Sequence, residues 1–121
     1  MHLSSIDRSE ICLELERILT SRKFRRATSQ ARFLKYAVEQ TIAGQGHLIR
    51  EQRIAHEGFG RNESFDPRLD PIVRTQALKL RTRLTMYYRS GGLNDPIRIE
   101  LIKGSYVPRF RRRDGSNIEV A

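Results

Sequence analysis

The apolar residues of this chain change their spacing once, between Gly92 and Ile97, and that change limits the fold more than any other feature. Before Gly92 they recur about every 3.6 residues, as on one face of an α-helix. After Ile97 they alternate with polar residues, as in a half-buried β-strand. The sequence therefore predicts a mainly helical fold that ends in a small β-hairpin, and its 121 residues suffice for one such core.

Two helices are expected in the N-terminal part of the chain. The first covers residues 8–20, and Asp7 stands at the first position of a capping box. The second is expected to begin near Thr28 or Ser29, because either hydroxyl can accept a hydrogen bond from the first helical turn. Gly44 is expected to end it, because glycine is the usual residue after a helix.

Two more helices are expected before the change in spacing. A turn or one small strand at residues 47–49 leads to a short helix over residues 50–60. After a loop with two prolines comes the longest helical pattern, residues 70–89. Asp70 is suited to be its N-cap and Pro71 its first helical residue.

A hairpin follows these helices. Residues 97–102 and 105–110 both alternate, and Lys103 and Gly104 between them suit a tight turn. Pro108 predicts an edge or a bend in the second strand, because proline lacks the N–H that a sheet needs. The remaining residues, 114–121, are expected to form a flexible tail.

The charge of the chain is one-sided. Residues 74–113 contain eleven Lys and Arg against two acids, which equals the net charge of +9 of the whole chain. A basic field on one part of a domain indicates a polyanionic partner. The sequence has no Gly-rich phosphate loop, no nucleophile motif and no metal-ligand spacing, so we expect no enzyme, cofactor or metal. Its start does not resemble a signal peptide, which makes the cytoplasm the expected location.

The basic helix over residues 70–89 has two faces. With a rotation of about 100° per residue and Leu80 pointing inward, one face is predicted to join the core; it comprises Val73, Ala77, Leu80, Leu84 and Tyr87. The opposite face contains no acid, and its N-terminal half would reach base edges in a DNA major groove. The candidate base readers are Arg74, Thr75, Leu78, Lys79 and Thr82.

These five side chains differ in what they could read. Arg74 and Lys79 could donate hydrogen bonds to guanine, while Thr75 and Leu78 could place methyl groups against thymine. The alternative is that all of them are an ordinary solvated helix surface. A hairpin directly after the helix favours the DNA interpretation.

Three helices followed by a hairpin is the order of a winged helix-turn-helix domain. VRTQALKLRTRL and DPIRIELIKGSYVPRF resemble the recognition helix and wing of OmpR/PhoB-type response regulators. FLKYAVEQTIAG, IREQRIAHEGFGR and FDPRLDPIVR look more like the N-terminal winged-helix module of bacterial regulators that continue into tetratricopeptide or cyclase-like regions. The resemblance covers about residues 24–110 and implies sequence-specific binding of double-stranded DNA by a transcriptional regulator. It divides the chain into an N-terminal helix (1–24), a DNA-binding domain (25–113) and the tail.

Further residues have expected roles, and the resemblance implies those at the wing. Lys103 and Gly104 would form the tip of the wing at the minor groove, and Ser105 stands where the response regulators usually have a second glycine. Tyr87, Tyr88 and Tyr106 are expected to pack inside the domain. The candidate phosphate contacts are Arg25, Arg26, Arg50, Arg81, Arg83, Arg109 and Arg111; of these, Arg83 lies at the core margin.

Two other functions remain open at this stage. The chain could be a protein-interaction module, with the helix at residues 8–20 as a homodimer or partner surface, because the response regulators have no such helix. RNA binding is a third alternative, although the aromatic strand pattern of common RNA-binding domains is missing. We expect no membrane association and no small-molecule ligand.

Overall fold

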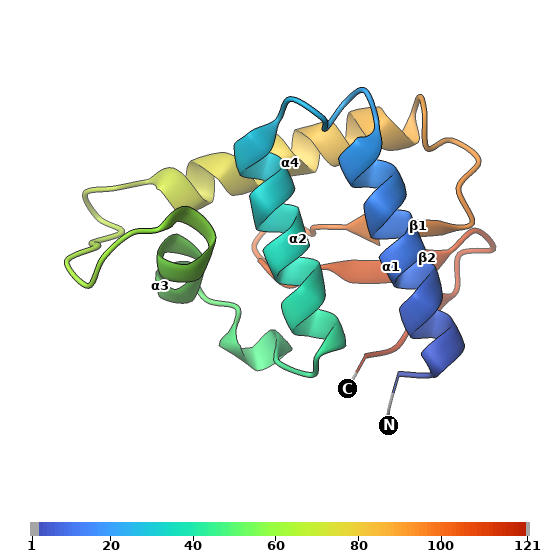
Figure 1. Cartoon of the computed structure of the whole chain (residues 1–121), viewed down its shortest axis with the longest axis horizontal. Coiled ribbons are helices and arrows are strands. Elements are labelled where there is room, and N and C mark those ends of the chain that lie inside the picture. The colour runs from blue at the N-terminus through green and yellow to red at the C-terminus, as the bar shows by residue number, and fades with distance from the viewer. Residues whose placement is uncertain (1–2, 121) are drawn as a thin grey trace.

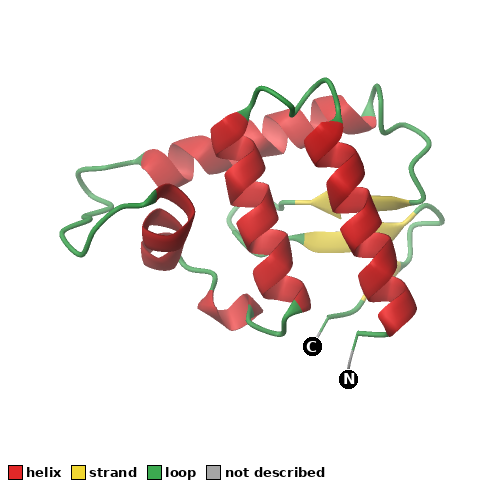
Figure 2. Cartoon of the chain, in the orientation of Figure 1, coloured by secondary structure: helices red, strands yellow, loops and turns green. Residues whose placement is uncertain are grey.

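A computed structural model describes residues 3–120 of the chain (Figure 1). Within these residues the protein is mainly helical, with a small antiparallel sheet (Figure 2). The helices are α1 (Ser5–Thr20), α2 (Thr28–Ile42), α3 (Glu51–Arg53), which continues into the π-helical turn η2 (Ile54–Gly58), and α4 (Ile72–Tyr88). The strands are β1 (Ile97–Glu100), β2 (Arg109–Arg112) and β3 (Asn117–Ile118), in the order β1-β2-β3. The predicted fold class is thus confirmed at the level of helices plus a small sheet.

The helix starts differ from the predicted ones. α1 begins before residue 8, because the Ser4 hydroxyl accepts a hydrogen bond from the Asp7 N–H at 3.0 Å and caps the helix. Asp7 instead pairs with Arg112 at 2.8 Å. α2 begins after Ala27 with no side-chain cap, so neither Thr28 nor Ser29 has the predicted capping role.

The two later helices are close to the predicted ranges. α3 and η2 together replace the helix expected at residues 50–60, and α4 replaces the one expected at residues 70–89. Asp70 accepts a hydrogen bond from the Ile72 N–H at 3.1 Å, while Pro71 occupies the cap position, so α4 starts one residue later than expected. The segment that was expected to be a turn or strand forms the 3₁₀ turn η1 (Gly46–Leu48). Gly44 follows α2 with a φ of +77°, a conformation that suits glycine.

The hairpin has shorter strands than predicted. Ile99 pairs with Phe110, so β2 starts at Arg109 rather than at residue 105. The turn at Lys103 and Gly104 does form, since the Ser105 N–H donates to the Ile102 carbonyl at 3.0 Å. The intervening residues 101–108 leave the sheet, because Pro108 offers no N–H to it.

The C-terminal segment is not simply a tail. Asn117–Ile118 pair with β2, and Ile118 is buried opposite Phe110. A turn makes this possible: Gly115 has a φ of +93°, and the Asp114 carboxylate accepts from the Ser116 N–H at 2.8 Å. The expectation of a flexible tail over residues 114–121 is therefore wrong where β3 forms. Its partner strand, β2, lies only a few residues upstream.

One core holds all these elements together. α1 and α2 stand side by side in front of the sheet, and α4 runs behind their upper ends (Figure 1). Every main helix and every strand contributes buried apolar side chains to this core; among them are Ile11, Phe33, Leu80, Ile99, Phe110 and Ile118. α1 is therefore an integral part of the packed unit. Among residues 3–120, no helix combines the length and apolar character needed to cross a membrane.

Candidate nucleic-acid interface

The rotation of α4 agrees with the predicted one. Its predicted core residues are all buried, from Val73 at 0% exposure to Tyr87 at 3%. The five candidate base readers are all exposed, and Leu78 keeps 63% of its surface in solvent. α4 contains no acidic residue. The exposed face is therefore free of negative charge, as the sequence indicated.

Arg74 is an exception among the five candidates. Its guanidinium pairs with Glu51 of α3 at 2.9 Å and donates to the Pro67 carbonyl at 2.6 Å. The side chain is thus tied to the protein in this structure, and its predicted contact with guanine would require it to leave Glu51 and the Pro67 carbonyl. The sequence offered no signal for this pair, because the two residues lie 23 positions apart.

The other four candidates project from α4 without such a tie. Thr82 donates its hydroxyl to the Leu78 carbonyl at 3.2 Å, so its methyl group remains for contacts outside the helix. Within residues 3–120, Lys79 has no ion-pair partner. Thr75 and Leu78 complete this surface, which we call the α4 face: Thr75, Leu78, Lys79 and Thr82.

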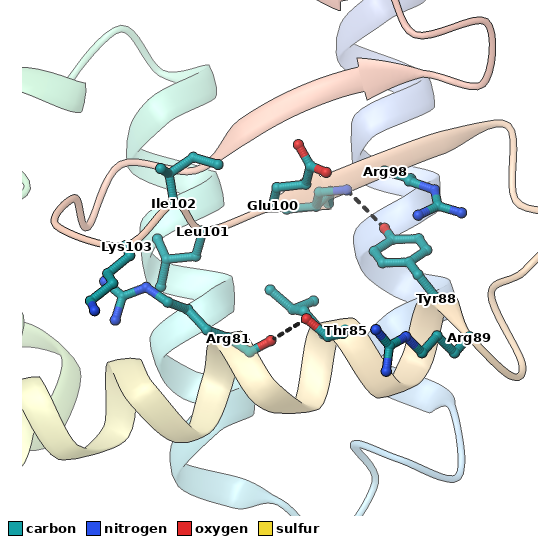
Figure 3. A pocket seen from close by; sticks show the side chains of 11 residues that line it. Arg81, Thr85, Tyr88, Arg89, Arg98, Glu100, Leu101, Ile102 and Lys103 are labelled. Carbon is teal, nitrogen blue, oxygen red and sulfur yellow. Dashed lines mark hydrogen bonds between the residues drawn. The ribbon is translucent and has the colours of Figure 1, made fainter.

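A basic groove runs along one side of α4. Its opposite wall is formed by β1 and by the first residues of the loop that follows β1. It has a volume of about 460 Å³. Arg81 and Lys103 lie at one end, and Arg89 and Arg98 at the other (Figure 3). Glu100 is the only acid in its lining. Four cations against one carboxylate make the groove attractive to an extended anion.

Contacts in the groove hold the loop of residues 101–108 close to α4. Arg81 donates to the Ser105 carbonyl at 3.1 Å, and its Nε has no hydrogen-bond partner among the described residues. The Ser105 hydroxyl accepts from the Val107 N–H at 3.1 Å, so Ser105 shapes the loop. Lys103 and Gly104 are exposed at its tip, where a φ of +88° explains the glycine.

Arg98 was missed by the sequence analysis. Its guanidinium lies 5.2 Å from the centre of the Tyr88 ring, which fixes it on the groove wall. The signal was present in the alternation of β1, since a residue between the buried Ile97 and Ile99 must point the other way. Tyr88 itself is buried, as predicted, and Tyr106 packs on Phe33 with ring centres 6.0 Å apart.

Besides Arg81, three predicted phosphate contacts already have partners within the protein. Arg109 and Arg111 both pair with Glu100, each at 3.0 Å, so one carboxylate offsets part of their charge. Arg83 donates to the Lys23 carbonyl at 2.5 Å and joins α4 to the turn before α2. Its position at the core margin agrees with this role.

The turn between α1 and α2 flanks the other side of α4. Phe24 of this turn packs against Tyr87 with ring centres 6.4 Å apart. Arg25 and Arg26 follow it and are exposed, without an ion-pair partner among residues 3–120. Arg50, the third exposed candidate, precedes α3. Cations therefore line the groove on one side of α4, and the turn that carries Arg25 and Arg26 packs against its other side through Phe24.

A buried polar cluster links α1 to α4 and β1 beneath this surface. The Tyr88 hydroxyl donates to Glu14 at 2.8 Å and accepts from the Ile99 N–H at 2.8 Å. Glu14 is fully buried, and this burial together with the nearby Asp95 carboxylate raises its pKa to about 7. The Arg17 ion pair at 3.1 Å opposes that rise. Sequence spacing alone did not reveal this cluster.

Comparisons with protein-family models, curated proteins and solved structures found no match to this chain. The likeness to winged-helix regulators consequently depends on the quoted sequence phrases and on the order of the elements.

Proposed function

We propose that the protein is a winged helix-turn-helix transcriptional regulator that binds double-stranded DNA sequence-specifically. α2, the α3–η2 segment and α4 would be its three core helices, and residues 97–110 its wing, with α1 as an added helix. α4 would enter the major groove, whose width of about 12 Å admits a helix. Such a role on bacterial nucleoid DNA would place the protein in the cytoplasm.

One observation carries the proposal: an acid-free helix face lies between two sets of cations. The phosphate backbones form the two walls of the major groove, so a helix inside it needs positive charge on both sides. The groove cations Arg81, Arg98 and Lys103 supply one side. Arg25 and Arg26, on the α1–α2 turn that packs against the opposite side of α4 through Phe24, would supply the other. An ordinary solvated helix does not require this arrangement.

Salt dependence of duplex binding tests the proposal directly. Each phosphate contact contributes about −0.9 to the slope of log K against log salt concentration. We expect Lys103→Gln, on the groove side, and Arg25→Gln, on the turn, each to make the slope less steep by about this amount. Arg8→Gln is the matched control, because Arg8 is an exposed cation on α1, away from α4.

Fluorescence anisotropy with a duplex selected from a random pool would give these slopes. Absence of duplex binding at about 50 mM salt would refute DNA binding. Equal slopes for all three variants and the unmodified protein would show that the cations beside α4 are not the contact surface.

The alternative function, a protein-interaction module, has one observation in its favour. Ile6 and Leu13 are 71% and 58% exposed and lie two turns apart on the same side of α1. A homodimer through this helix would cover them. Deleting α1 cannot test this idea, because Ile11 and Ile18 belong to the core. Ile6→Ser with Leu13→Ser leaves the core intact, and loss of a dimer in analytical ultracentrifugation would support it.

A further inference from the structure

The side chains on the α4 face limit which base edges the helix can read. Guanine is usually read by a bidentate arginine, and adenine by a bidentate asparagine or glutamine. Arg74 is the only arginine among the five candidate readers, and it is held by Glu51 and the Pro67 carbonyl at 2.9 and 2.6 Å. Gln76, the only amide in α4, is hydrogen-bonded to Gln30 of α2. Neither bidentate reader is therefore available in this arrangement.

Methyl groups and aliphatic carbon dominate what remains. Leu78 is 63% exposed, so its aliphatic side chain is accessible for contacts outside the protein. Thr75 and Thr82 lie beside it on the same face and each carries a methyl group. The Thr82 hydroxyl is already used by the Leu78 carbonyl. Lys79 is the single cation on the face, and it acts as a point charge rather than as a planar fork.

Thymine is the base that such a surface fits. In the major groove it presents a 5-methyl group, which makes apolar contacts with side chains of this kind. We propose that the α4 face recognises thymine by its 5-methyl groups, with Leu78 as the central contact. This inference depends on the proposed DNA binding and specifies the class of base that the same surface selects.

Deoxyuridine isolates the methyl group, because it pairs like thymidine and lacks only that group. The probe is the duplex selected from a random pool, with each thymine replaced in turn by uracil. Removing a contacted methyl should weaken binding about fourfold, which corresponds to the free energy of burying one methylene group. Replacement of guanine by 7-deazaguanine, which removes the N7 acceptor, should change Kd less than uracil does.

Leu78→Ala connects the effect to the protein. Alanine is a good helix former and Leu78 is exposed, so the variant should fold. We expect it to bind the thymine duplex more weakly and to lose the difference between thymine and uracil at its contact. Leu93→Ala is the matched control, because Leu93 is 55% exposed but lies beyond the end of α4. It should retain the full difference.

The outcomes separate the inference from the proposed function. Salt-dependent binding of the selected duplex that is insensitive to every uracil would keep DNA binding and overturn thymine readout. A large effect of 7-deazaguanine without an effect of uracil would overturn it too and would indicate Lys79 or a released Arg74 as a guanine reader. Failure to bind any duplex would overturn both. Uracil sensitivity that Leu78→Ala removes would confirm the inference.

Discussion

Glu14→Gln should change how the stability of the protein depends on pH. In the unfolded chain the Glu14 carboxyl has its ordinary pKa of 4.5, and in the folded protein burial and the neighbouring Asp95 raise this pKa to about 7. Below the lower value, both states are protonated at this group. Between the two values the unfolded chain releases a proton that the folded protein retains, so the free energy of unfolding falls as pH rises.

The size of this loss follows from the two pKa values. At about 1.4 kcal/mol for each pH unit, a rise from 4.5 to about 7 amounts to about 3 kcal/mol, complete once the pH exceeds the folded pKa. A glutamine resembles the protonated carboxyl and still accepts from the Tyr88 hydroxyl, yet it does not titrate. The variant should therefore lack this part of the pH dependence, whatever constant offset the substitution adds.

Urea denaturation followed by circular dichroism, from about pH 5 to about pH 8, measures the effect. Glu16→Gln is the matched control, because Glu16 is exposed on the same helix. Asp66 and Asp70 have lowered pKa values through Arg68 and Arg61, so their contribution is lost only at more acidic pH. If Glu14→Gln and the unmodified protein lose stability in parallel over this range, the buried carboxyl does not hold its proton and the reasoning is refuted.

Three further predictions concern core packing and the ion pair between Arg74 and Glu51. Gly92→Ala should destabilise the protein by about 1 to 3 kcal/mol in thermal unfolding, because a Cβ there would lie 2.2 Å from the Tyr87 ring; an unchanged melting temperature would contradict that contact. Ile118→Ala should lower the free energy of unfolding by about 2 to 4 kcal/mol in the same measurement. If the C-terminal segment were flexible, this substitution would leave the stability unchanged. Glu51→Ala should release Arg74 and strengthen duplex binding in anisotropy, and unchanged binding would show that the ion pair does not restrain Arg74.

The α4 helix shows how much could be predicted from the sequence. Its span was predicted to within one residue at each end, and the buried side from Val73 to Tyr87 was predicted in full. Both follow from the spacing of neighbouring residues, which a helix converts into a face. The predicted exposure of Thr75 and Leu78 is a consequence of the same rotation.

The strands and the cation partners could not be predicted in the same way. The start of β2 depends on Ile99 pairing with Phe110, and β3 depends on Ile118 reaching that residue from the other side. A whole loop separates Arg74 from Glu51 in the sequence, and most of the chain separates Arg112 from Asp7. Neither register nor ion pairs have a local pattern that spacing analysis can detect.

The sequence by itself determined the helical segments, the orientation of α4 and the concentration of positive charge in the C-terminal part. The tertiary structure decided which cations keep their charge available, which candidate reader is tied to the protein, and that Glu14 is buried beside Tyr88. The physical reason is that helix periodicity arises between residues a few positions apart, whereas burial and ion pairing arise only when distant segments pack together. A residue type indicates what a side chain can bind, and its neighbours in the fold decide whether it is free to do so.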